Sequence, residues 1–162
     1  PFQEANINDW EVMLDTNVKG LLYMSRLISP LMIKNKKGHI INISSIAGKQ
    51  VYAGGHVYCA SKFAVDALCK AMRIDLLKHQ IRVTSINPGM VETDFSLVRF
   101  KGDTDKAATM YQGYKALTAH DIADNVWYAA SRPPHVNINE IIITPTAQAN
   151  AYHLVRDADL EV

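Results

Sequence analysis

The sequence predicts an α/β fold in which a parallel β-sheet is flanked by helices. Three short runs rich in Ile and Val have the length and composition of buried strands, over residues 39–45, 82–87 and 139–144. A longer segment with apolar residues at helical spacing precedes each run. Helices and strands therefore alternate along the chain, which is the order that a parallel sheet with helical crossovers requires.

The first helical segment is expected over about residues 9–37. Asn8 is expected to cap its start, where Glu11 adds an acidic first turn. Gly38 should stop the helix, and Pro30 should kink it near its end. Apolar residues are too numerous here for a helix with a single buried side. We therefore expect it to lie between the sheet and either solvent or another subunit.

Two further helices and one irregular segment complete the pattern. A glycine-containing loop over residues 46–57 leads into a helix over 57–79. Residues 90–118 look irregular, with room for short helices. A third helix is expected over 118–131, and Pro133 with the proline after it should end that helix.

Length and composition indicate one globular domain over residues 1–162. The chain is 48% hydrophobic, and its net charge of +1 comes from 17 basic and 16 acidic residues. This balance gives no sign of a nucleic-acid or membrane surface. No run has the length of a transmembrane helix and no signal peptide opens the chain, so a cytoplasmic location is expected.

The cysteines and histidines argue against a disulfide and a metal centre. Cys59 and Cys69 fall in one predicted helix, with Cα atoms about 15 Å apart, which is too far for a disulfide. Two buried free thiols agree with a reducing compartment. The 6 histidines are scattered without a His-x-x-x-His or Cys-x-x-Cys pattern, so metal catalysis is not expected.

Three polar residues suggest a catalytic site. Ser45 ends the first predicted strand, and Tyr58 and Lys62 share a face of the following helix because they are four positions apart. A lysine beside a tyrosine favours the phenolate, whose pKa is otherwise about 10. The arrangement suits reversible proton transfer at an alcohol or carbonyl oxygen. Pro88 and Gly89 follow the second strand, so they should meet Ser45 at the sheet edge where ligands bind.

Two competing patterns are weaker. Tyr111 and Lys115 form a second Tyr-x-x-x-Lys pair, but no strand ending in Ser precedes them at the right distance. A Ser/Lys hydrolase is a further alternative, and Ser61 beside Lys62 lacks the spacing that such enzymes use.

These motifs, in this order, resemble those of the short-chain dehydrogenase/reductase family over nearly the whole chain. Asn17 with Gly20 matches the family's Asn-x-x-Gly, and Ser45, the Tyr58–Lys62 pair and the Pro88–Gly89 turn follow. Thr93 matches a downstream threonine. The resemblance implies a Rossmann-like parallel sheet with flanking helices, and a nicotinamide cofactor that carries out hydride transfer.

The resemblance also implies a role for each catalytic residue. Tyr58 would be the general acid/base, and Lys62 would lower its pKa and hold the nicotinamide ribose. Ser45 would bind the substrate oxygen. Asn17 would hold a water of a proton relay, through its backbone in a distorted turn. Taken alone, Asn17 also fits a buried helix asparagine, and Ser45 also fits a cap at the strand end.

Further residues would line the cofactor. The resemblance places Pro88, Gly89, Val91 and Thr93 around the nicotinamide, in addition to Tyr58 and Lys62. Thr93 fits a helix cap equally well.

A narrower resemblance suggests the substrate. Segments 52–55, 98–103, 116–118 and 135–139 look like those of NADP-dependent 3-hydroxy acid dehydrogenases, which act on serine, allo-threonine, 3-hydroxyisobutyrate or malonic semialdehyde. NADP is the expected cofactor, with NAD not excluded. Arg99 is a candidate for the substrate carboxylate, because its guanidinium can bind both oxygens. An exposed or subunit-pairing arginine remains an equal alternative.

The family's amino-terminal nucleotide-binding half is not found in this sequence, which contains no Gly-x-x-x-Gly-x-Gly. The chain therefore reads as the catalytic carboxyl-terminal portion of such an enzyme, and it should bind dinucleotide weakly or not at all by itself. Another short-chain reductase, such as a 3-oxoacyl reductase, and a non-catalytic truncated relative stay open. The family commonly pairs its long helices, which implies a homodimer or tetramer.

Overall fold

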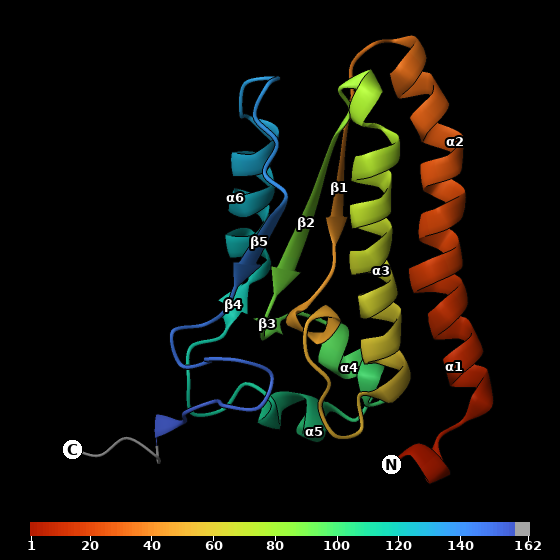
Figure 1. Ribbon diagram of the computed structural model, residues 1–162. Coiled ribbons are helices and arrows are strands. Elements are labelled where there is room, and N and C mark those ends of the chain that lie inside the picture. The colour runs from red at the N-terminus through yellow and green to blue at the C-terminus, as the bar shows by residue number, and fades with distance from the viewer. Residues whose placement is uncertain (158–162) are drawn as a thin grey trace.

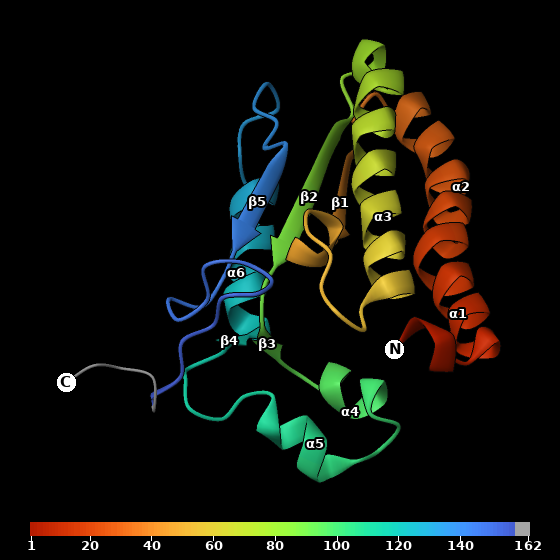
Figure 2. The ribbon, with the colours of Figure 1, turned by 60° about the horizontal axis from the view of Figure 1, so that its bottom comes forward.

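The computed structural model describes residues 1–157 and contains the predicted parallel sheet. Its three strands, β1 (His39–Ile43), β2 (Arg82–Pro88) and β5 (Glu140–Ile143), lie in the order β1-β2-β5. All neighbours are parallel, with Ile41 opposite Thr84 and Asn87 opposite Ile142. The helices α2 and α3 lie side by side on one side of this sheet, and α6 lies on the other (Figures 1 and 2).

The first long helix contains a widened turn near its middle. It consists of α1 (Ile7–Leu14), a π-helical turn (Asp15–Lys19) and α2 (Gly20–Lys34). Pro30 lies inside α2, which ends four residues later at Lys34. Asn6 caps α1 by accepting a hydrogen bond from Asn8 N, and the expected cap at Asn8 is wrong by two residues.

The second and third helices form close to their predicted positions. The helix α3 (His56–Asp75) gives way to a 3-10 turn (Leu77–His79). A capping box of Thr118 and Asp121 starts α6 (Ala119–Ala130).

Residues 91–118 are more ordered than the sequence suggested. They contain two short helices, α4 (Phe95–Arg99) and α5 (Thr104–Thr109). They also contain a small parallel sheet of β3 (Val91–Glu92) and β4 (Leu117–Thr118). Strands of two residues have no periodicity to detect, which is why the sequence analysis missed them.

The core lies where α3 packs on the sheet. Its buried members come from α3, β2 and the turn between them: Val65, Cys69, Leu76, Ile81 and Val83. Burying one such apolar side chain contributes about 1.5–3 kcal/mol. Cys59 and Cys69 are both buried free thiols, as predicted. No helix within residues 1–157 is both long enough and apolar enough to cross a membrane.

The strand β1 is paired on one side only. Its partner is β2, and among the described residues no strand pairs with its opposite edge. A hollow of about 310 Å³ lies along this part of the molecule, lined by residues of β1, α3 and the π-helical turn that include Ile43, Lys62 and Asn17.

Candidate active site

The structure brings Ser45 and Tyr58 together at the carboxyl ends of the strands. Tyr58 lies in the first turn of α3, and Ser45 follows β1. Burial raises the pKa of the Tyr58 phenol, while a hydrogen bond with Ser45 acts in the opposite direction. The Tyr58 phenol and the Ser45 hydroxyl thus lie within hydrogen-bonding distance of each other. They do so at the edge where a parallel sheet binds its ligands.

Ser45 is held by three contacts at once. Its hydroxyl accepts a hydrogen bond from Ala47 N at 3.1 Å and donates one to the Pro88 carbonyl at 3.3 Å. The first bond caps a 3-10 turn (Ile46–Gly48), so the capping explanation of Ser45 is also correct. The second bond links the ends of β1 and β2, which fixes the hydroxyl beside the phenol.

Lys62 lies beside Tyr58 without making the phenol more acidic than usual. Its Nζ atom is 5.8 Å from the centroid of the Tyr58 ring and donates a hydrogen bond to the Ile43 carbonyl at 3.1 Å. Burial lowers the pKa of Lys62. After burial and Ser45, the groups that affect the pKa of Tyr58 are Cys59, which raises it, and Arg99, whose charge lowers it. The cation whose charge opposes the burial effect at Tyr58 is therefore Arg99, and the role of Lys62 in lowering the pKa of Tyr58 stays a prediction.

Asn17 is connected to the same helix through its side chain. It lies in the π-helical turn, and its Nδ2 atom donates to Ser61 Oγ at 3.1 Å. Ser61 Oγ in turn donates to the Tyr58 carbonyl at 2.7 Å. The distorted turn expected at Asn17 is present, and the side-chain link to the Tyr58 backbone is an addition that the sequence did not indicate.

The turn after β2 is closely packed. Gly89 N donates to the Ile143 carbonyl at 2.7 Å, which ties this turn to β5. A Cβ atom at Gly89 would overlap the carboxamide of Gln148, so a larger residue here would displace that side chain. Gln148 is 6% exposed and accepts a hydrogen bond from Met90 N at 2.9 Å. Gln148 could not be predicted from the sequence, because a single glutamine after the last strand belongs to no pattern.

Val91 and Thr93 extend this turn toward α4. The Val91 carbonyl accepts a hydrogen bond from the Tyr111 hydroxyl at 3.0 Å, and that hydroxyl also bonds Ser96 Oγ at 2.7 Å. The second Tyr-x-x-x-Lys pair is thus occupied in holding this segment. Thr93 Oγ1 accepts a hydrogen bond from Phe95 N at 3.3 Å, but the residue at the N-cap position of α4 is Asp94, so Thr93 is not the helix cap of the alternative explanation.

Arg99 reaches the site from the exposed end of α4. Its guanidinium carbon is 5.6 Å from the centroid of the Tyr52 ring, and its charge lowers the pKa of both Tyr52 and Tyr58. Burial outweighs this at Tyr52 and raises its pKa to about 12. Tyr58 also packs on Phe95, with ring centroids 5.4 Å apart. A cation from α4 therefore faces the same position as the phenol.

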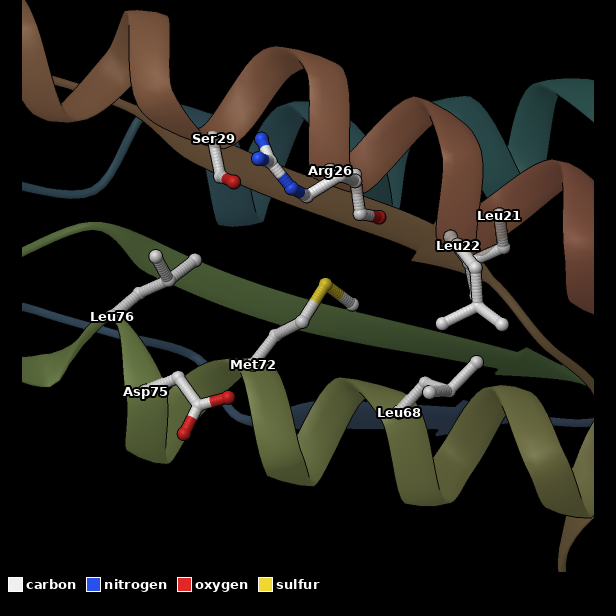
Figure 3. Close-up of a pocket in the computed structure, with 9 residues that line it drawn as sticks. Leu21, Leu22, Arg26, Ser29, Leu68, Met72, Asp75 and Leu76 are labelled. Atoms are coloured by element: carbon white, nitrogen blue, oxygen red, sulfur yellow. The ribbon is translucent and has the colours of Figure 1, made fainter.

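A second groove, of about 270 Å³, lies between α2 and α3, away from these residues. Figure 3 shows Leu22 of α2 and Met72 of α3 pointing into the gap, near the charged side chains of Arg26 and Asp75. None of the expected catalytic residues lines it, so this groove is separate from the candidate active site.

Comparisons with known proteins agree with this geometry. A family model described as short chain dehydrogenase matches residues 1–103, which include every residue expected at the site. The NADP-dependent 3-hydroxy acid dehydrogenase YdfG of Salmonella typhi is 49% identical over 152 residues, or 93% of this chain and 61% of that relative. The sulfoacetaldehyde reductase of Chromohalobacter salexigens is 44% identical over 96% of this chain and 62% of that relative.

Among solved structures, the closed form of a serine dehydrogenase complexed with NADP+ superposes with a TM-score of 0.92 at 47% identity. That match covers 96% of this chain and 63% of the serine dehydrogenase. The chain thus spans about three-fifths of the length of the relatives it matches.

Proposed function

The chain belongs to the short-chain dehydrogenase family, and from this premise we propose that residues 1–162 form the catalytic carboxyl-terminal portion of an NADP-dependent oxidoreductase. The reaction we propose interconverts a 3-hydroxyl and a 3-oxo group on a small hydroxy acid, such as serine, allo-threonine or 3-hydroxyisobutyrate. The observation that carries the proposal is the meeting of Ser45, Tyr58 and Lys62 at the carboxyl edge of the sheet.

The residues present suit the nicotinamide end of the cofactor. Lys62 Nζ lines the hollow along β1 and can donate to ribose hydroxyls there, and Val91 follows the tight Gly89 turn. When bound, the nicotinamide supplies the hydride chemistry. The sequence contains no Gly-x-x-x-Gly-x-Gly to bind a diphosphate. We therefore propose that the intact protein binds NADP, as its relatives do, and that residues outside this sequence bind the diphosphate.

In this mechanism Tyr58 moves the proton and Ser45 holds the reacting oxygen. During oxidation the phenolate accepts the proton of the substrate hydroxyl, and during reduction the phenol returns it. The Ser45 oxygen is held by Ala47 N, and its one proton, which the hydroxyl donates to the Pro88 carbonyl in this structure, would turn to the substrate oxygen when substrate binds.

Arg99 is proposed to bind the carboxylate of the substrate. Its position beside Tyr52 and its electrostatic effect on Tyr58 support this role over a purely exposed arginine. A fixed guanidinium favours a small anionic substrate over the neutral chain of an acyl thioester. The sulfonate acted on by one relative carries the same charge, so sulfoacetaldehyde belongs among the substrates to be compared.

The test is a substrate profile of the intact protein with NADP+ and NADPH. We expect turnover of L-serine or 3-hydroxyisobutyrate, and loss of that turnover in Tyr58→Phe without loss of the folded state. Tyr128→Phe is the matched control, because Tyr128 lies on the far helix α6. Preference for 3-oxoacyl thioesters would favour the alternative reductase, and unchanged turnover in Tyr58→Phe would remove Tyr58 as the proton donor.

A second copy of the chain is the macromolecular partner we propose. The helix α2 exposes large apolar side chains, namely Tyr23, Met24, Leu27 and Leu31. Arg26 of α2 and Asp75 of α3 flank the neighbouring groove with opposite charges, so antiparallel copies could pair one with the other. Light scattering should give a dimer or tetramer that Leu27→Glu dissociates, and a monomeric wild type would refute it.

A further inference from the structure

Lys49 connects the loop that carries Ser45 to two other elements. Its Nζ atom lies 2.5 Å from Asp66 Oδ1 on α3 and 2.5 Å from Glu140 Oε2 on β5. Lys49 directly follows the 3-10 turn that Ser45 caps. An ion pair therefore joins three segments behind the candidate active site.

Asp66 is the buried centre of this cluster. It is 7% exposed, and it has two cationic partners, Lys49 and Lys70, the second at 2.8 Å. Lys70 is exposed and lies four residues along the same helix, so its ion pair is internal to α3. Of the two partners, only Lys49 joins α3 to the Ser45 loop.

The same loop meets α3 at the turn that carries Lys62. Ser44 Oγ donates to the Lys62 carbonyl at 3.4 Å. Gly48 approaches that carbonyl so closely that a Cβ atom would lie 2.7 Å from its oxygen. Asp66 lies one helical turn after Lys62, so these contacts and the Lys49 ion pair dock the loop on adjacent turns of α3.

We propose that Lys49 is a positioning residue for catalysis. Its ion pair with Asp66 holds the Ser45 loop against α3 and thereby sets the hydrogen bond between Ser45 and Tyr58. The inference rests on the proposed function, because it assumes that Tyr58 transfers the proton. A merely structural ion pair at Lys49 would not affect that transfer.

The surroundings of Tyr58 make this role measurable. The titratable groups that affect the pKa of Tyr58 are Cys59 from α3 and Arg99 from α4, and Lys62 of α3 and Tyr52 of the preceding loop lie nearby. None of them is bonded to Lys49. Removal of Lys49 should therefore weaken only the Ser45 bond, which favours the phenolate, and Tyr58 should ionise at higher pH.

The experiment compares four variants of the intact protein in the oxidation direction. Lys49→Met should lower kcat by about tenfold and move the rising limb of its pH profile to higher pH. Lys49→Arg should restore both values, because it keeps the charge. Lys70→Met removes the other partner of Asp66 and should leave kcat and the pH profile unchanged. Lys49→Gln provides the same readout should Lys49→Met not fold.

Two results would overturn the inference and are distinct from failure of the proposed function. The first is an unchanged pH profile in a folded Lys49 variant, with activity reduced only in proportion to the folded fraction. The second is an equal effect of Lys49→Met and Lys70→Met. Absence of turnover in the wild type would instead refute the proposed function itself.

Discussion

The two sides of the candidate site are built differently. Ser45 and Tyr58 come from the sheet and α3, where each is held by several contacts to a buried framework. Arg99 comes from the short helix α4 and is exposed to solvent. This difference suggests that proton transfer depends on a fixed geometry, whereas substrate selection depends on a segment that can vary without disturbing the sheet.

The largest effect is expected from a change at Ser45, on the side of the site that the sheet and α3 hold in place. Ser45→Ala removes a hydroxyl that the framework aims at the reacting oxygen, so kcat should fall by about 10²- to 10³-fold. The thermal midpoint should change little in comparison. Steady-state kinetics and a melting curve of the same preparation measure both. A rise in KM alone, with kcat intact, would show that Ser45 binds the ground state and the transition state equally.

At Arg99, on the side of the site formed by α4, we expect a smaller effect, and we expect it on KM more than on kcat. Arg99→Met should raise KM for a carboxylated substrate by about 10- to 100-fold, with a lesser change in kcat, since a charged hydrogen bond is lost. A neutral alcohol substrate should show no such loss.

Lys101→Met serves as the matched control for Arg99. Lys101 lies two residues further along and pairs with Asp9 at 2.7 Å, outside the site. Equal losses in the two variants would mean that general surface charge, and not the Arg99 fork, attracts the substrate.

The smallest effect concerns the end of the sheet opposite the site. His39 Nε2 lies 2.7 Å from Thr84 Oγ1, and burial, followed by the charge of Arg82, lowers the pKa of His39 to about 4. The unfolded chain binds this proton near pH 6.5. Between these two values only the unfolded state is protonated, so stability should decrease as pH falls from about 6.5 toward 4.

Urea unfolding of the intact protein at several pH values tests this expectation. His39→Gln should flatten the dependence in that window, and its kcat should match the wild type because His39 is remote from Ser45. An unchanged slope in the variant would assign the dependence to other groups.

The sequence predicted the parts of the molecule that are local in the chain. Ser45, Tyr58 and Lys62 lie on one strand and the next helix, so strand period and helix spacing were enough to bring them together. The contacts between distant segments were not predictable in this way. The approach of Arg99 to Tyr52, the packing of Gln148 on Gly89, and the Lys49 ion pair each join residues that share no periodic pattern.

The details of the first long helix show the same limit of local sequence patterns. The widened turn at Asp15–Lys19 was expected only from the family resemblance at Asn17, because helix propensity does not reveal it. Pro30 was expected to kink the helix near its end, and α2 continues past it to Lys34.

The half-paired strand β1 has a practical consequence for work with this polypeptide. A row of backbone amides and carbonyls without a neighbouring strand acts as a template for strand addition. When these residues are produced by themselves, we expect self-association through β1 and accumulation in the insoluble fraction. Protecting this edge of β1 should therefore be the first step in any preparation meant for biochemistry.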